Sequence, residues 1–196
     1  SITDIDKLES GKDVLEEELL GIDTRMGSLV GTQQDNKTKL KEFKRKIDLY
    51  SDDDVNGKYL QLTHLQEHKK EIRVDIDKLK IEVKNKLDKI EKLGHLEYDE
   101  NCDYCMKNPF TLDAIDTQES LDNDKGLARN KLSELDDIDK KINDLKDYHD
   151  KKIDYDRSVD KLKEIEISQN RLDSESTLLK EKKKTTLLKI KSLEER

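Results

Sequence analysis

The stretch NCDYCMKNPF, residues 101–110, contains both cysteines of the chain and its only proline. On either side of it the sequence is dominated by Lys, Glu, Asp, Leu and Ile. A single Cys-x-x-Cys motif therefore separates two long charged segments near the middle of the chain. The fold depends on whether those two segments are helices and whether the chain turns back at this stretch.

The composition limits the possible fold classes. Charged residues make up 44% of the 196 residues, hydrophobic residues 32% and aromatic residues 4%, and Trp is absent. Globular domains carry about 45 to 50% apolar and about 25% charged residues. The chain has too little apolar material for a compact core of this length, which leaves either disorder or long helices that bury a narrow stripe.

Periodicity favours long helices over disorder. Apolar residues recur at alternating spacings of three and four, which is the heptad pattern of a coiled-coil seam. In the first run 11 of 14 positions are apolar: Ile5, Leu8, Lys12, Leu15, Leu19, Ile22, Met26, Leu29, Gln33, Asn36, Leu40, Phe43, Ile47 and Tyr50. In the second run 8 of 10 are apolar: Leu62, Leu65, Lys69, Ile72, Ile76, Leu79, Val83, Lys86, Ile90 and Leu93. Weaker runs follow the cysteines, one including Leu121, Ala128, Leu135, Ile138, Ile142 and Leu145, and one including Tyr155, Leu162, Ile165, Leu172, Leu179, Ile190 and Leu193.

Residues that end and start helices flank the cysteines. Gly94 follows the last residue of the second run, and glycine commonly ends a helix. Asn108 and Pro109 suit the N-cap and the first position of a new helix. Because a narrow seam needs a facing partner, we predict an all-α fold, a long antiparallel coiled-coil hairpin with an apical Cys-x-x-Cys hook loop. The predicted parts are an ascending arm over 1–94, a loop over 95–108 and a returning arm over 109–196.

The two cysteines have the spacing of metal ligands. Cys102 and Cys105 can bind one ion together, but structural zinc takes four ligands in a tetrahedron. His95 and a few carboxylates lie close in sequence, yet no second pair with ligand spacing occurs in the chain. The simplest completion is a second copy of the same loop. We therefore predict one zinc ion shared by two chains.

A long antiparallel coiled coil with one apical Cys-x-x-Cys resembles the zinc hook of the SMC-like DNA double-strand-break repair ATPases, the SbcC type and its eukaryotic and viral relatives. The resemblance implies that Cys102 and Cys105 are the zinc ligands and that the chain forms a homodimer through the hook. Many hooks have Pro after the first cysteine and Gly after the second, whereas this chain has Asp103 and Met106. Apolar or aromatic residues beside the cysteines are candidates for the dimer interface: Tyr98, Tyr104, Met106 and Phe110.

Two functions follow as hypotheses. The first is a structural dimerisation and tethering module of a DNA-repair ATPase and nuclease complex; the resemblance implies a nuclease subunit and DNA at distant heads, with little direct DNA binding by this chain. The alternative is a coiled-coil scaffold with a redox-active or incidental cysteine pair.

No enzymatic activity is expected of this chain. Gly21, Gly27 and Gly31 lack the spacing of a phosphate-binding loop, and HLQEH (64–68) has Leu65 where a zinc protease needs its general base.

Length and terminal features give weaker indications. No apolar run approaches the roughly 18 residues that span a bilayer. We therefore expect no membrane association and an intracellular location, nuclear or cytoplasmic. The chain begins with Ser, and we expect it to be a fragment of a longer protein.

A joint in the rod is predicted from the spacing of seam residues. From Ile47 to Leu62 there are 15 residues, and from Ile142 to Tyr155 there are 13, where an unbroken heptad pattern needs 14. Each arm slips by one residue, and reflection about the middle of the loop brings both slips to one level. We predict that the coil opens or bends near Gly57 and Tyr148.

Overall fold

Five helices make up the described part of the chain. The computed structural model describes residues 1–94 and 101–196, without the side chains of residues 93, 94, 105 and 106. The helices are α1 (Ile2–Asp52), α2 (Val55–Gly94), α3 (Asp103–Met106), α4 (Pro109–Leu145) and α5 (Tyr148–Glu194). No strand occurs within these ranges, which confirms the all-α class.

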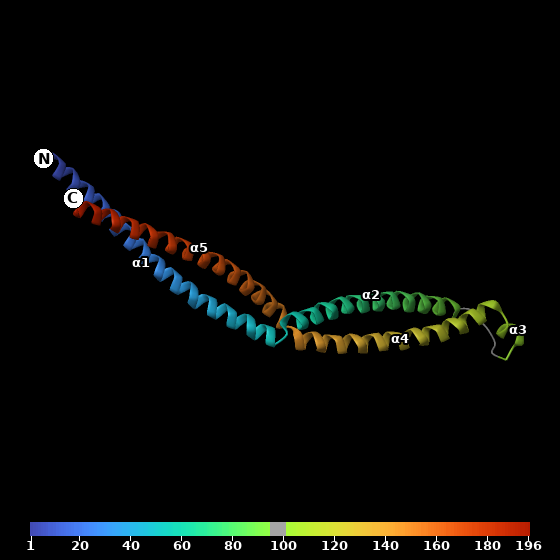
Figure 1. Cartoon of the computed structure of the whole chain (residues 1–196). Coiled ribbons are helices and arrows are strands. Elements are labelled where there is room, and N and C mark those ends of the chain that lie inside the picture. Colours follow the sequence, from blue (N-terminus) through green and yellow to red (C-terminus); the bar gives the residue numbers. More distant parts are fainter. Residues whose placement is uncertain (95–100) are drawn as a thin grey trace. The chain divides into compact units, whose positions relative to one another are not determined.

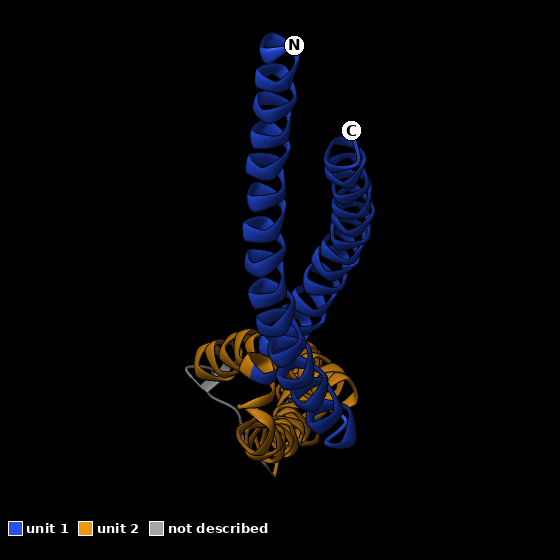
Figure 2. Ribbon diagram, turned by 60° about the vertical axis from the view of Figure 1, so that its left-hand side comes forward, with its two compact units in different colours: residues 1–54, 151–196 blue, residues 55–150 orange. Residues whose placement is uncertain are grey.

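The helices form two compact units. Unit 1 comprises residues 1–54 and 151–196, and unit 2 comprises residues 55–150, as Figure 2 shows in two colours. In unit 1, α1 lies beside α5, with the N- and C-termini at the same end; in unit 2, α2 lies beside α4 (Figure 1). Each predicted arm therefore contains two helices, and each unit contains one pair of long helices from opposite arms, with α3 also in unit 2.

The predicted seams are the buried faces of these helices. Every seam position whose side chain is described is buried or half-buried, except Ile5, which is exposed near the N-terminus. In unit 2, Ile72, Ile76 and Ile138 form a buried cluster. Complete burial of such a side chain stabilises the fold by about 1.5 to 3 kcal/mol. These narrow stripes supply the apolar burial that a compact core gives to globular domains.

All five polar positions in the first two runs bond to the facing helix. They pair as Lys12 with Glu194 (3.0 Å), Gln33 with Asp173 (2.9 Å), Asn36 with Ser168 (3.4 Å), Lys69 with Asp139 (2.5 Å) and Lys86 with Asp124. Within each unit the partner's number falls as the first number rises, so the helices run antiparallel. A buried polar group in a seam destabilises the fold unless it has a hydrogen-bond or charge partner. Each pair therefore favours the observed register over registers in which one helix is shifted along the other.

Both arms are interrupted inside the segments where the spacing slips. On the first arm α1 ends at Asp52 and α2 begins at Val55, and between them Asp54 has a φ of 50°. Asp tolerates this left-handed conformation better than most residues. On the second arm α4 ends at Leu145 and α5 begins at Tyr148. The interruption of the first arm therefore lies at Asp53 and Asp54. Gly57, where the joint was predicted, lies just after it in the first turn of α2.

Candidate metal centre

The Cys-x-x-Cys motif lies at a single helical turn between α2 and α4. Cys102 directly precedes α3, and Cys105 is the third residue of that helix. The N–H of Lys107 donates to the Asp103 carbonyl at 3.0 Å and closes the turn. Cys102 is half-buried, and the side chain of Cys105 lies outside the described part. The backbone thus places one cysteine just before this short helix and the other within it.

The residues predicted to end and start helices lie at the ends of α2 and α4. Gly94 is the last residue of α2. Asn108 is the N-cap of α4, and its side-chain Oδ1 accepts from the N–H of Phe110 at 2.9 Å, while Pro109 occupies the first helical position. This cap satisfies one of the backbone N–H groups that a helix start leaves unbonded. A tight start of α4 fixes where the returning arm leaves the cysteine turn.

Two of the four proposed interface residues have described side chains. Tyr104 is 81% exposed and Phe110 is 66% exposed. Tyr98 lies outside the described residues, and so does the side chain of Met106. The other five Phe and Tyr side chains that the structure describes are half-buried. Tyr104 and Phe110 flank the turn on both sides of Cys105.

The donor chemistry fits half of a tetrahedral zinc site. Two thiolates three residues apart are the usual half-site of structural zinc. Within the described residues, no group of three or more His, Cys, Asp or Glu side chains is arranged to hold a metal ion. His68, considered for a protease motif, lies in α2 and contacts Glu134 of α4 at 3.0 Å. The side chain of Cys105 and residues 95–100 lie outside the described part, so the remaining ligands of a site at Cys102 and Cys105 stay a prediction.

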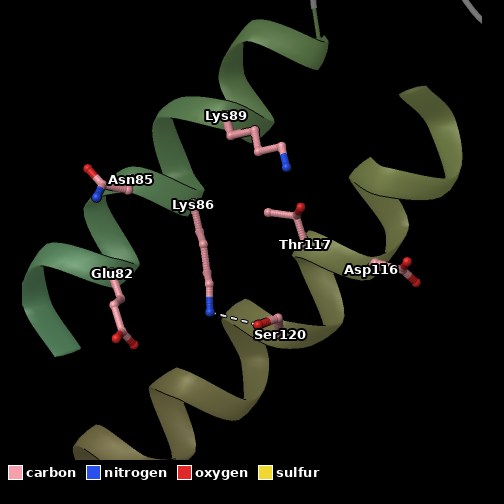
Figure 3. Close-up of a pocket in the computed structure, with 7 residues that line it drawn as sticks. All are labelled: Glu82, Asn85, Lys86, Lys89, Asp116, Thr117 and Ser120. Atoms are coloured by element: carbon pink, nitrogen blue, oxygen red, sulfur yellow. Dashed lines mark hydrogen bonds between the residues drawn. The ribbon is translucent and has the colours of Figure 1, made fainter. Parts of the chain in front are cut away.

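The polar part of the α2 and α4 seam lies between the cysteine turn and the isoleucine cluster. Figure 3 shows Lys86 reaching across to Ser120, with a distance of 2.7 Å from Nζ to Oγ. Lys86 also contacts Asp124, whose side chain is buried, and Lys89 pairs with Asp113 at 2.7 Å. The open hollow beside them has a volume of about 400 Å³. Its two lysines are already paired across the helices, so these pairs favour one register and the hollow offers no spare cation to a ligand.

A second polar cluster lies in unit 1 beside the helix interruption. The Tyr50 hydroxyl donates to the Asp154 carboxylate, which also pairs with Lys46 at 2.7 Å. The bond to Asp154, aided by desolvation, raises the pKa of Tyr50 to about 12. The bonds from Lys46 and then Tyr50 lower the pKa of Asp154. Tyr155 packs edge-on against the Tyr50 ring, with centroids 6.1 Å apart, so the cluster ties the end of α1 to the start of α5.

Comparisons with known proteins give no relative. No protein-family model, curated protein or solved structure matches the chain. None of the helices that the structure describes combines the length and the apolar character needed to cross a bilayer. Function is therefore inferred from the residues themselves.

Proposed function

We propose that this chain is a dimerisation and tethering module that shares one zinc ion with a second copy of itself. The observation that carries the proposal is the position of Cys102 and Cys105 at one helical turn, between two helices that pair antiparallel. No other cysteine occurs in the sequence. A zinc ion bound there supplies a structural cross-link rather than catalysis.

The chain's own residues account for both parts of this role. Cys102 and Cys105 hold the ion, and Tyr104 and Phe110 provide apolar surface against the second chain. The capped start of α4 and the polar pairs of the seam keep the turn at the end of a defined helix pair. The hook is thereby presented to a partner at a fixed distance from the rest of unit 2.

The resemblance to the zinc hooks of SMC-like repair ATPases supplies the wider proposal. In this proposal the arms connect the hook to ATPase heads that work with a nuclease on DNA. The chain itself has a net charge of −8, which disfavours DNA binding along most of its surface. Its contribution is mechanical, because it holds two distant assemblies together.

Zinc content and mass test the proposal together. Protein purified under reducing conditions is analysed for zinc, and its mass is measured by light scattering before and after a strong chelator. We expect half an equivalent of zinc per chain and a dimer that the chelator or acid dissociates, because the ligands must be thiolates. One zinc per monomer, or none, would contradict the shared site.

The matched control is the double variant Cys102→Ser with Cys105→Ser. We expect it to bind no zinc and to remain monomeric. Its circular dichroism should be unchanged, because the seams are buried independently of the turn. Loss of helix in this variant would show that the metal is needed for folding instead of for dimerisation.

A further inference from the structure

An apolar groove runs along one face of the α2 and α4 pair. Its volume is about 320 Å³, and its apolar lining is Ile76, Leu79, Val83, Ala128 and Leu132. Ala128 occupies a seam position where the other runs place larger side chains, so the facing helices leave space above it. Leu132, at the edge, is 53% exposed. The hairpin therefore covers one side of this part of its seam incompletely.

Three cations surround the groove: Lys80, Lys125 and Arg129. None of them forms an ion pair with any residue that the structure describes. Other lysines of unit 2 do pair across the helices, as Lys89 does with Asp113 and Lys131 with Asp75. The segment KGLARNKL, residues 125–132, carries three cations and no carboxylate, although the whole chain is acidic. Positive charge and apolar surface thus coincide at one place in a negatively charged molecule.

We infer that this groove docks an amphipathic helix of a partner protein, with a short apolar row flanked by Asp and Glu. A third helix laid on a helix pair buries apolar side chains at spacings of three and four in such a groove. Its flanking carboxylates then pair with Lys80, Lys125 and Arg129. Nucleic acid fits less well, because the floor of the groove is apolar and a phosphate backbone would leave that apolar surface uncovered.

Fluorescence anisotropy with a designed peptide tests the inference. The probe is a labelled helical peptide of about three heptads with Leu along one seam and Glu beside it, titrated with the full chain. We expect saturable binding that weakens with salt. Lys125→Glu with Arg129→Glu should weaken binding at least about tenfold, corresponding to about 1.4 kcal/mol. Leu132→Ser should weaken it several-fold; because Leu132 is half exposed, this variant should fold.

Control variants and peptides distinguish specific binding at this groove from non-specific binding elsewhere on the chain. Lys78→Glu and Leu87→Ser alter an exposed cation and a 46% exposed leucine of α2 that do not line the groove, and both should bind as the unaltered chain does. A peptide with Lys in place of Glu should not bind. Equal binding of the two peptides, or equal loss in the control variants, would overturn the inference.

The inference would also be overturned if a second copy of this chain, and not a partner protein, occupied the groove. Self-association of the Cys102→Ser, Cys105→Ser variant, abolished by adding Leu132→Ser, would identify that occupant. Binding of duplex DNA at the same residues, without binding of the acidic peptide, would likewise count against a partner helix.

Discussion

Lys86 of α2 places its ammonium 2.7 Å from the Ser120 hydroxyl of α4, at a seam position where a leucine would ordinarily lie. The same ammonium contacts Asp124, which is 7% exposed. This pair brings a positive and a negative charge into the narrow apolar stripe of unit 2. It specifies which residues of the two arms face each other close to the cysteine turn.

Breaking this pair from one side should destabilise unit 2. Lys86→Met leaves the buried Asp124 carboxylate without its cation, and we expect a loss of about 2 kcal/mol, below the range for a fully buried pair because Lys86 is partly exposed. Lys86→Leu with Asp124→Leu should recover most of that loss. Urea unfolding followed by circular dichroism measures both, with Lys78→Met as the exposed control. A single variant as stable as the unaltered chain would show that the pair contributes nothing.

Much of the fold could be predicted because a heptad pattern is a local and repeated signal. The runs through Leu29 and Ile72 identify the buried face, and both side chains are at most 2% exposed. The pairing of the arms followed from the turn residues around the cysteines. The individual partners of Lys12 and Gln33 could not be predicted from the sequence, because many carboxylates lie within reach of any one seam position.

Some core positions could not be predicted, because their residue types are polar. Ser158 is 1% exposed and Thr186 is 4% exposed. Each hydroxyl donates to the carbonyl four residues earlier in its own helix, Asp154 at 2.7 Å and Lys182 at 2.9 Å. Such a bond satisfies the hydroxyl without a partner on the other helix, so a serine or threonine can occupy the seam. Adding Ser158 closes the gap between Tyr155 and Leu162, and adding Thr186 shortens the gap between Leu179 and Ile190.

The sequence indicates the candidate metal ligands but does not indicate the groove. Cysteine spacing alone points to Cys102 and Cys105, and the zinc ion remains a prediction. The groove over Ala128 depends on a small residue facing three cations from two helices. Only the pairing of α2 with α4 brings Lys80 beside Lys125, so no local pattern indicates it.

The bond between Tyr50 and Asp154 predicts a dependence of stability on alkaline pH. The pKa of Tyr50 rises from 10.0 to about 12 on folding, so its contribution is complete below pH 10 and is lost as the pH rises towards 12. Tyr50→Phe should lower stability by about 1 kcal/mol at neutral pH, because one hydrogen bond is lost. Between these two pH values, the thermal unfolding temperature of Tyr50→Phe should fall less steeply with rising pH than that of the unaltered chain.

Tyr104→Phe is the control for that experiment, since Tyr104 is 81% exposed. Its stability should follow the unaltered chain at every pH. An ultraviolet titration should also assign a pKa of about 12 to Tyr50. Identical alkaline curves for the unaltered chain and Tyr50→Phe would refute the role of this bond.

Phe110 should contribute to dimerisation and not to folding. It is 66% exposed in the single chain, so Phe110→Ser leaves the helix content unchanged. If it packs against the second hook, the zinc-bound dimer should dissociate about five- to tenfold more readily, as expected for an aromatic interface residue worth about 1 kcal/mol or more. Sedimentation at several concentrations measures this. Leu60→Ser, at a 55% exposed position far from the turn in sequence, should leave the dimer unchanged, and equal effects of both variants would exclude a specific role.

The paired interruptions of the arms predict a flexible joint that can be removed by design. Deleting Asp54 changes the spacing from Ile47 to Leu62 from 15 to 14, and inserting one alanine after Lys146 changes the spacing from Ile142 to Tyr155 from 13 to 14. With both changes the heptad pattern is continuous on both arms. The left-handed residue, with its φ of 50°, is also gone. We expect amide hydrogen exchange in segments 51–61 and 146–155 to slow by about tenfold or more, because local opening then breaks continuous helices.

The single changes provide the control for the joint. Deletion of Asp54 alone corrects one arm while the other keeps its slip, so exchange should slow much less than in the combined variant. Exchange in the middle of α1, far from the interruption, should be the same in all variants. If the unaltered chain exchanges as slowly at residues 51–61 as in the middle of α1, the interruption is a rigid irregularity, and the hook has no joint about which to reorient.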